Sequence, residues 1–149
     1  MIAIFLAILC STTGCHADTI QISTPAAIVA MCESGDTVTV GSLDWQAVNV
    51  NADGTVDSGA WQFNNYWIWN ADDRWIVRPF ANQVLGMSSD TALHIWPTVR
   101  DMPPRVQYAL FEYVWNNGRG WSHWSASRGC WGRYMSIVDG VAVVKELGQ

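Results

Sequence analysis

Tryptophan content is the feature of this sequence that most constrains how the chain can fold. The 149 residues include ten tryptophans, at positions 45, 61, 67, 69, 75, 96, 115, 121, 124 and 131. A ring of this size is seldom left in water: it packs in a core or interface, or it stacks on the flat face of a sugar or base. We therefore expect most of the rings to fill the interior of a folded protein and a few to form a binding face. Half of the residues are hydrophobic and 14% are charged, which, at this length, predicts one folded domain.

The charge of the chain limits its partners. Eight Lys and Arg residues stand against 13 Asp and Glu residues, which gives a formal net charge of −5 at pH 7. No run of basic residues is present that would follow a phosphate backbone, so nucleic acid is not an expected partner.

The N-terminus has the pattern of an export signal. Nine consecutive apolar residues, 2–10, precede small and polar residues, and this length suits a secretory signal but is too short to span a membrane. Small side chains at Cys15 and Ala17 predict a signal over 1–17 and a mature domain over 18–149, with no stable membrane insertion after cleavage. The alternative is a lipoprotein signal ending at Cys15, with Thr12 where Leu is usual. Both predict a secreted or periplasmic protein, although no Lys or Arg precedes the apolar run.

The four cysteines are Cys10, Cys15, Cys32 and Cys130. If the signal is removed, Cys32 and Cys130 remain, and an exported domain with two distant cysteines most simply joins them in one disulfide. Such a bridge would contribute on the order of 4 kcal/mol in the chain-entropy picture. The alternative is two buried free thiols in a cytosolic protein. No CxxC or HxxxH spacing is present, so neither a metal site nor another cofactor is expected.

A helix is expected from Thr24 to just before Gly35, with Ser23 as its N-cap. Glu33 lies at its C-terminal end, where the helix dipole and apolar neighbours both raise the pKa of a carboxyl group. The face expected to be buried carries Ile28, Met31 and Cys32.

The rest of the chain predicts an α+β protein. Short extended segments at 37–40 and 47–50, with a tight turn at Asp53-Gly54, predict a small antiparallel sheet with a hairpin. Helices are expected over 80–85, 88–96 and 103–117, the last burying Val106, Leu110, Tyr113 and Val114. Residues 118–132 are expected to form an irregular, ring-rich loop, and no element is predicted for 133–149.

Glu33 and Asp57 form a candidate catalytic pair. Glycoside cleavage needs one carboxyl group that stays protonated, to donate to the leaving oxygen, and another that stays ionised against the oxocarbenium-like transition state. Glu33, at the apolar helix end, suits the first role. Asp57 suits the second, because Thr55, Ser58 and Asn64 surround it in a polar hairpin. The alternative is that both are solvated surface carboxylates.

Two stretches resemble the active-site region of the lysozyme-like superfamily. They are CESG at 32–35 and DGTVDSGAWQFN at 53–64; the second is similar to the hairpin of c-type lysozymes. CESG together with GRGWSHWSASRGCWG at 118–132 looks like resuscitation-promoting factors and related phage or bacterial lytic transglycosylases. The resemblance covers about residues 24–132.

This resemblance implies a lysozyme-like fold, with a helical domain and a small β-hairpin sheet flanking an active-site cleft. It also implies cleavage of the β-1,4 bond between MurNAc and GlcNAc in peptidoglycan strands, with Glu33 as general acid and Asp57 as second carboxylate. The cysteine before the glutamate would be bridged to the Trp-rich segment, which pairs Cys32 with Cys130. The implied substrate-binding residues are Gln62 and Asn64 for N-acetyl and hydroxyl groups, and Trp67, Trp61 and Tyr66 for stacking. Trp121 and Trp124 would lie either on the far lip or around the disulfide.

The sequence departs from both patterns. Glu33 and Asp57 lie further apart than the corresponding acids of c-type lysozymes, and the several disulfides of animal lysozymes are absent. Resuscitation-promoting factors generally lack the second carboxylate. Hydrolysis and lytic transglycosylation therefore both stay open.

Two rival interpretations also stay open. Residues 49–57 resemble the start of a calcium-binding loop, but position one is Asn49 and position twelve is Ala60. Alternatively, the protein is a non-catalytic module that binds cell-wall glycan through its tryptophans. Because an acidic surface opposes an anionic wall, a catalytic role would suit a larger assembly such as a virion or secretion apparatus.

Overall fold

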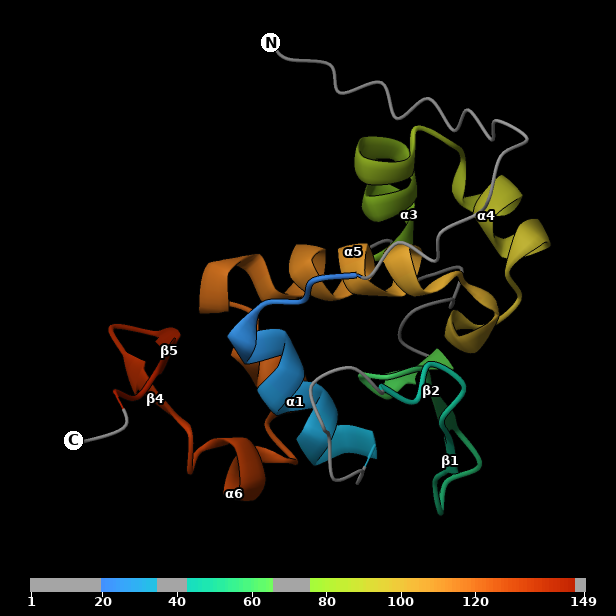
Figure 1. Cartoon of the computed structure of the whole chain (residues 1–149). Helices are drawn as coiled ribbons and strands as arrows, with labels where there is room; N and C mark the ends of the chain where they lie inside the picture. The colour runs from blue at the N-terminus through green and yellow to red at the C-terminus, as the bar shows by residue number, and fades with distance from the viewer. Residues whose placement is uncertain (1–19, 35–42, 66–75, 147–149) are drawn as a thin grey trace, which may run out of the picture.

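The computed structural model describes residues 20–34, 43–65 and 76–146. It is an α+β protein in which helices α1 (Thr24–Ser34) and α5 (Pro104–Trp115) lie at the centre, between a small antiparallel sheet and a separate β-hairpin (Figure 1). The α+β class expected from the sequence is therefore confirmed. The predicted signal at 1–17 and the predicted strand at 37–40 lie outside the described residues. The other elements, in chain order, are β1 (Val48–Val50), β2 (Val56–Ser58), β3 (Phe63–Asn64), α3 (Val77–Phe80), the π-helix η1 (Ala81–Leu85), α4 (Ser89–Ile95), the 3₁₀ turns η2 (Val99–Asp101), η3 (Asn116–Gly118) and η4 (Trp121–Trp124), α6 (Arg128–Trp131), β4 (Met135–Val138) and β5 (Val141–Val144).

The three-stranded sheet has the order β1-β2-β3, and each neighbouring pair is antiparallel. Its first hairpin turns at Asp53-Gly54, as predicted. The Oδ1 of Asp53 accepts a hydrogen bond from the backbone N–H of Thr55 at 2.9 Å, and Gly54 has φ +83°. A side chain that bonds the backbone two residues on, followed by a glycine with positive φ, stabilises a tight turn without strain.

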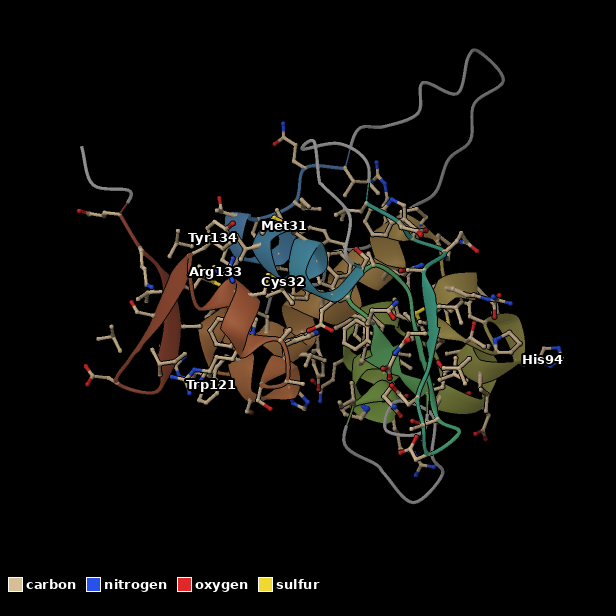
Figure 2. The ribbon with its side chains drawn as sticks, turned by 90° about the horizontal axis from the view of Figure 1, so that it is seen from below. Met31, Cys32, His94, Trp121, Arg133 and Tyr134 are labelled. Carbon is tan, nitrogen blue, oxygen red and sulfur yellow. A yellow bond between two sulfur atoms is a disulfide. The ribbon has the colours of Figure 1, made fainter. Side chains whose placement is uncertain are left out.

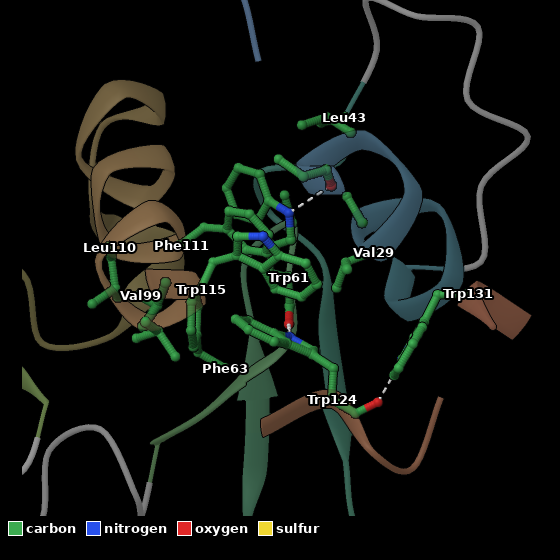
Figure 3. Close-up of a cluster of buried hydrophobic side chains, with 14 of the residues drawn as sticks. Val29, Leu43, Trp61, Phe63, Val99, Leu110, Phe111, Trp115, Trp124 and Trp131 are labelled. Atoms are coloured by element: carbon green, nitrogen blue, oxygen red, sulfur yellow. Dashed lines mark hydrogen bonds between the residues drawn. The ribbon is translucent and has the colours of Figure 1, made fainter. Parts of the chain in front are cut away.

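Aromatic rings fill the core (Figure 3). The ring of Trp61 stacks on Phe111 with centroids 4.9 Å apart, and Phe111 lies 5.0 Å from Trp124. The indole N–H groups also link the elements: Trp61 donates to the carbonyl of Ala26 in α1, Trp124 donates to Trp61, and Trp131 donates to Trp124. The rings thus stabilise the core by burial, and their buried N–H groups are satisfied by backbone carbonyls of other segments.

A buried glutamine attaches the sheet to helix α5. Gln107 has no exposed surface; its Oε1 accepts from the N–H of Ala60, and its Nε2 donates to the carbonyls of Trp45 and Met102. It requires a glycine beside it, because a Cβ at Gly59 would lie 2.6 Å from its Oε1. The turn between β2 and β3 is therefore held by hydrogen bonds to the side-chain amide of Gln107 as well as by the core.

The three later helices predicted from the sequence are present, as α3 with η1, α4 and α5. The N-cap of α4 is Ser88, whose hydroxyl accepts from the N–H of Thr91 at 3.1 Å. Helix α5 ends earlier than expected, at Trp115, because Asn116 adopts the left-handed conformation at φ 46°.

The predicted buried face of α1 is wrong by about one position. The buried residues are Ala26, Val29 and Ala30, whereas Ile28 and Cys32 are only partly buried. The ring of Trp61 approaches the helix closely enough to hydrogen-bond the carbonyl of Ala26. Small side chains permit this approach and larger ones would prevent it.

The C-terminal third is more ordered than predicted. Residues 118–132 contain η4 and α6 rather than an irregular loop, and β4 pairs with β5 as an antiparallel hairpin. The hairpin turns at Asp139 and Gly140, both with positive φ. An Asp-Gly pair between two apolar runs is a strong hairpin signal, so this element was predictable.

Candidate active site

The C-terminal end of α1 and the three-stranded sheet meet at a hollow of about 260 Å³. Glu33 reaches it from α1, Asp57 from β2, and Gln62 and Asn64 from the turn and strand that follow. The opposite wall consists of Ile76, His123, Trp124 and Ala126. The structure therefore brings together both acids of the candidate pair, although 24 residues separate them in the chain.

Two other hollows share lining residues with this one. A neighbouring hollow of about 350 Å³ along β1 shares Glu33, Asp57 and Gln62 with it. Another, of about 560 Å³ beside the end of α5, shares Ile76 and His123. The two acids thus line two adjoining hollows, and a third lies beside the first.

Glu33 is half-buried at the end of α1. Burial raises the pKa of its carboxyl group above the ordinary value; a side-chain hydrogen bond with Ser127 lowers the pKa in part, and the negative charge of Asp57 raises it further. The direction predicted from the sequence is confirmed, with burial as the main cause. Glu33 therefore keeps its proton to a higher pH than a solvated glutamate.

Asp57 is held by two asparagines. Its Oδ2 accepts from the Nδ2 of Asn51 at 2.9 Å, and its Oδ1 accepts from the Nδ2 of Asn64 at 2.7 Å. Both amides also donate to the Oγ1 of Thr55, which donates to the Oδ1 of Asp53. Asp57 is consequently a fixed acceptor within a hydrogen-bonded hairpin.

The predicted substrate-binding residues have different outcomes. Gln62 lines the hollow, and its Nε2 donates to the carbonyl of Gly59. Asn64 lines it too, but its amide N–H groups donate to Asp57 and Thr55, so it positions the acid.

The stacking prediction is wrong for Trp61. This residue has no exposed surface and lies between Phe111 and α1, because its ring is part of the core. Tyr66 and Trp67 lie outside the described residues. Trp124 lines the hollow, as the first of its two predicted places requires, but it is only 3% exposed because its ring packs on Phe63, Phe111 and Trp115.

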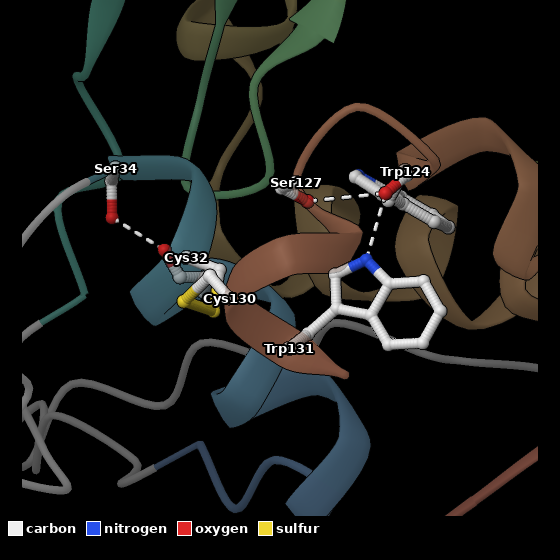
Figure 4. The surroundings of a disulfide bond; sticks show 7 residues. Cys32, Ser34, Trp124, Ser127, Cys130 and Trp131 are labelled. Atoms are coloured by element: carbon white, nitrogen blue, oxygen red, sulfur yellow. Dashed lines mark hydrogen bonds between the residues drawn. A yellow bond between two sulfur atoms is a disulfide. The ribbon is translucent and has the colours of Figure 1, made fainter. Parts of the chain in front are cut away.

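The predicted disulfide between Cys32 and Cys130 is confirmed, with the two Cα atoms 5.7 Å apart (Figure 4). Cys32 directly precedes Glu33, and Ser127 lies three residues before Cys130. The bridge therefore joins the two segments that supply Glu33 and its hydroxyl partner.

Sequence reasoning missed Asn51 and Ser127. Asn51 had a usable signal: Asn49 pairs with Asp57 across β1 and β2, and a residue two positions further along shares that face. Ser127 had none in its own neighbourhood. Only the disulfide, once paired, brings it near Glu33.

The segment 49–57 that resembled a calcium loop forms a β-hairpin, and its polar side chains bond one another. In the described ranges, no group of three or more His, Cys, Asp or Glu side chains is arranged to hold a metal ion. None of the helices in this part of the chain has the length and apolar character needed to cross a membrane.

Comparisons with known proteins identify no relative of this chain. No protein-family profile, no curated protein and no solved structure matches the chain.

Proposed function

We propose that this protein is a peptidoglycan-degrading glycosidase that cleaves the β-1,4 bond between MurNAc and GlcNAc. The observation that carries the proposal is the contrast between the two acids of one hollow. Glu33 is half-buried with a raised pKa, and Asp57 is bonded by two amide donors. This is the division of roles that glycoside cleavage requires. The hollows that adjoin the acids leave space for a polymeric substrate, and the resemblance to the lysozyme-like superfamily supplies the choice of polymer.

In the first step, Glu33 donates its proton to the glycosidic oxygen, and the bond between that oxygen and C1 of MurNAc breaks. The positive charge that develops on C1 and the ring oxygen is stabilised by the carboxylate of Asp57. Because Asn51 and Asn64 hold Asp57 from both sides, the carboxylate need not reorient as the charge develops, which is the basis of electrostatic preorganisation.

In the second step, the Glu33 carboxylate accepts a proton from the nucleophile that attacks C1. If water attacks, the product is reducing MurNAc. If the 6-hydroxyl of the same MurNAc attacks, the product is a 1,6-anhydro ring. Glu33 regains its proton either way, so the same acid serves both reactions.

The experiment is mass spectrometry of purified peptidoglycan after digestion by the parent protein and by Glu33→Gln. We expect the variant to lose at least about 100-fold in rate, the lower end of what general acid catalysis contributes, and to stay folded. Glu146→Gln is the matched control, because it makes the same chemical change at an exposed position outside the hollow. A folded Glu33→Gln protein with parental activity would exclude Glu33 as the acid.

The products separate the two chemistries. Reducing-end MurNAc identifies a hydrolase, and 1,6-anhydro products identify a lytic transglycosylase. Retained binding without any product, from parent and variant alike, would instead support the non-catalytic glycan-binding module.

The proposed location is the bacterial envelope, secreted or periplasmic, or carried there by a virion. The disulfide supports it, because such bonds persist in oxidising compartments.

A further inference from the structure

Helix α6, strand β4 and Lys145 line a second hollow, of about 420 Å³, which shares none of its described lining residues with the hollow that contains Glu33 and Asp57. Its polar lining includes Arg128, Arg133, Lys145 and Ser136. Its floor is apolar and closed, since Trp131 and Met135 are each 1% exposed. We refer to it as the basic hollow.

The basic hollow differs in the sign of its charge from the protein as a whole. It gathers three of the eight basic residues of the whole chain, and none of its described lining residues is acidic. Without these three cations, the net charge of −5 would become −8. Figure 2 shows Arg133 at the end of the molecule formed by α6 and the hairpin, far from His94 on α4. One strongly positive concavity therefore lies on an otherwise acidic protein.

Contacts within the fold hold two of the cations in place. The guanidinium carbon of Arg128 lies 5.4 Å from the ring centroid of Trp121. Such a cation–π contact uses the face of the guanidinium and not its N–H groups. The Nζ of Lys145 donates to the carbonyls of Gly132 at 2.7 Å and Arg133 at 3.4 Å, which leaves one of its three N–H donors. The side chains of Arg128 and Lys145 are thus held in place by the protein itself.

We propose that the basic hollow binds phosphate groups of a polyol-phosphate chain. Two arginines and a lysine around one cavity suit phosphate, because a guanidinium can donate two parallel hydrogen bonds to its oxygens. The rival polyanion is a single-stranded nucleic acid, which is usually bound by stacking its bases on aromatic rings. Among the described residues that line the hollow the aromatic ring is that of Trp131, which is buried and offers no such face; Tyr134, 39% exposed, follows Arg133 but does not line the hollow. A phosphodiester chain without bases therefore fits better.

This site would act as a tether. Charge repulsion opposes the approach of an acidic enzyme to an anionic wall, and a local phosphate site offsets that repulsion. The tethering role rests on the proposed function, whereas the binding itself does not.

The test is isothermal titration of poly(glycerol phosphate) into the full chain; this polymer has no glycosidic bond, so cleavage plays no part. We expect saturable binding that weakens as salt rises. The double change Arg128→Gln with Arg133→Gln should weaken it at least 10-fold. Arg100→Gln, which removes one exposed positive charge outside the hollow, should change it less than 2-fold. Thermal melts establish that each variant is folded.

A second arm tests the geometry. Arg133→Lys keeps the charge but removes the paired donors, and we expect an affinity between those of the parent and of Arg133→Gln. Three results would overturn the proposal: no saturable binding, an equal loss with Arg100→Gln, or tighter binding of single-stranded nucleic acid than of the polyol phosphate. Because the readout is binding, its failure leaves the glycosidase proposal untouched.

Discussion

Replacing Gln107 with Leu tests whether a buried amide holds the sheet, and with it Asp57, against helix α5. The parent side chain makes three hydrogen bonds: one from the N–H of Ala60 at 3.3 Å, and two to the carbonyls of Trp45 and Met102 at 3.0 Å each. Leu is similar in size and fills the same space. The change therefore removes the hydrogen bonds without opening a large cavity.

The expected magnitude follows from those three partners. Leaving a buried donor or acceptor without a partner costs about 1–3 kcal/mol. The bonds to Ala60 and Met102 are buried, and the bond to Trp45 is partly buried. The greater burial of apolar surface by Leu offsets about 1 kcal/mol of the loss. We expect the free energy of unfolding to fall by about 3 kcal/mol, and Tm by roughly 5–15 °C.

The assay is urea unfolding followed by tryptophan fluorescence, with wall cleavage measured alongside. Gln46→Leu is the matched control, because the Nε2 of Gln46 also donates to a backbone carbonyl, that of Arg100, but at an exposed position. It should change the free energy of unfolding by less than about 0.5 kcal/mol. A loss below about 1 kcal/mol for Gln107→Leu, or equal losses for the two variants, would refute the reasoning.

Two further predictions concern the disulfide and the acid. Removing the Cys32–Cys130 bridge, by Cys→Ser changes at both positions, opens a link across 98 residues; in the chain-entropy account this costs about 4.7 kcal/mol. Calorimetry should record a Tm lower by roughly 10–20 °C, and an unchanged Tm would contradict it. Burial raises the pKa of the Glu33 carboxyl group in the folded state. The contribution of this group to the free energy of unfolding is therefore full below its unfolded pKa and is lost as pH rises through its folded pKa. Glu33→Gln should therefore raise Tm at pH 7 relative to the parent and lose that advantage at pH 4, and the opposite trend would be evidence against a buried acid.

Local signals in the sequence were enough for much of the fold and for the acid pair. Ser88, the Asp53-Gly54 turn and the prolines at 103–104 each act within a few residues, so they mark where elements begin and end whatever the rest of the chain does. The prediction for Glu33 also depended on local features, namely the end of a helix and its apolar neighbours. The Asp139-Gly140 hairpin belongs to the same class and shows that the signal was present but unused.

Long-range contacts decided the rest. Trp61 lies in a polar segment that favours a binding role, yet Phe111, 50 residues later, makes it part of the core. Gln107 lies on a helix whose apolar spacing predicts Val106 at the buried face. The amide is buried instead because three backbone groups satisfy it, two of them, at Trp45 and Ala60, from distant segments. Neither outcome can be derived from spacing along one element.

The candidate site lies where three parts of the chain meet, and a specific bond holds each pair of neighbouring parts together. Gln107 attaches the sheet that carries Asp57 to α5, while the Cys32–Cys130 bridge attaches the end of α1, with Glu33, to the segment that carries Ser127. Both contacts lie against the aromatic core, because Ala60 and Met102, which bond Gln107, belong to it and Cys32 packs on it. A hydrophobic core fixes overall packing but tolerates small shifts, whereas a covalent bond and buried hydrogen bonds fix particular atoms. A fold that needs two carboxyl groups of different character in one hollow therefore benefits from holding each of them by a directional contact close to the acid itself.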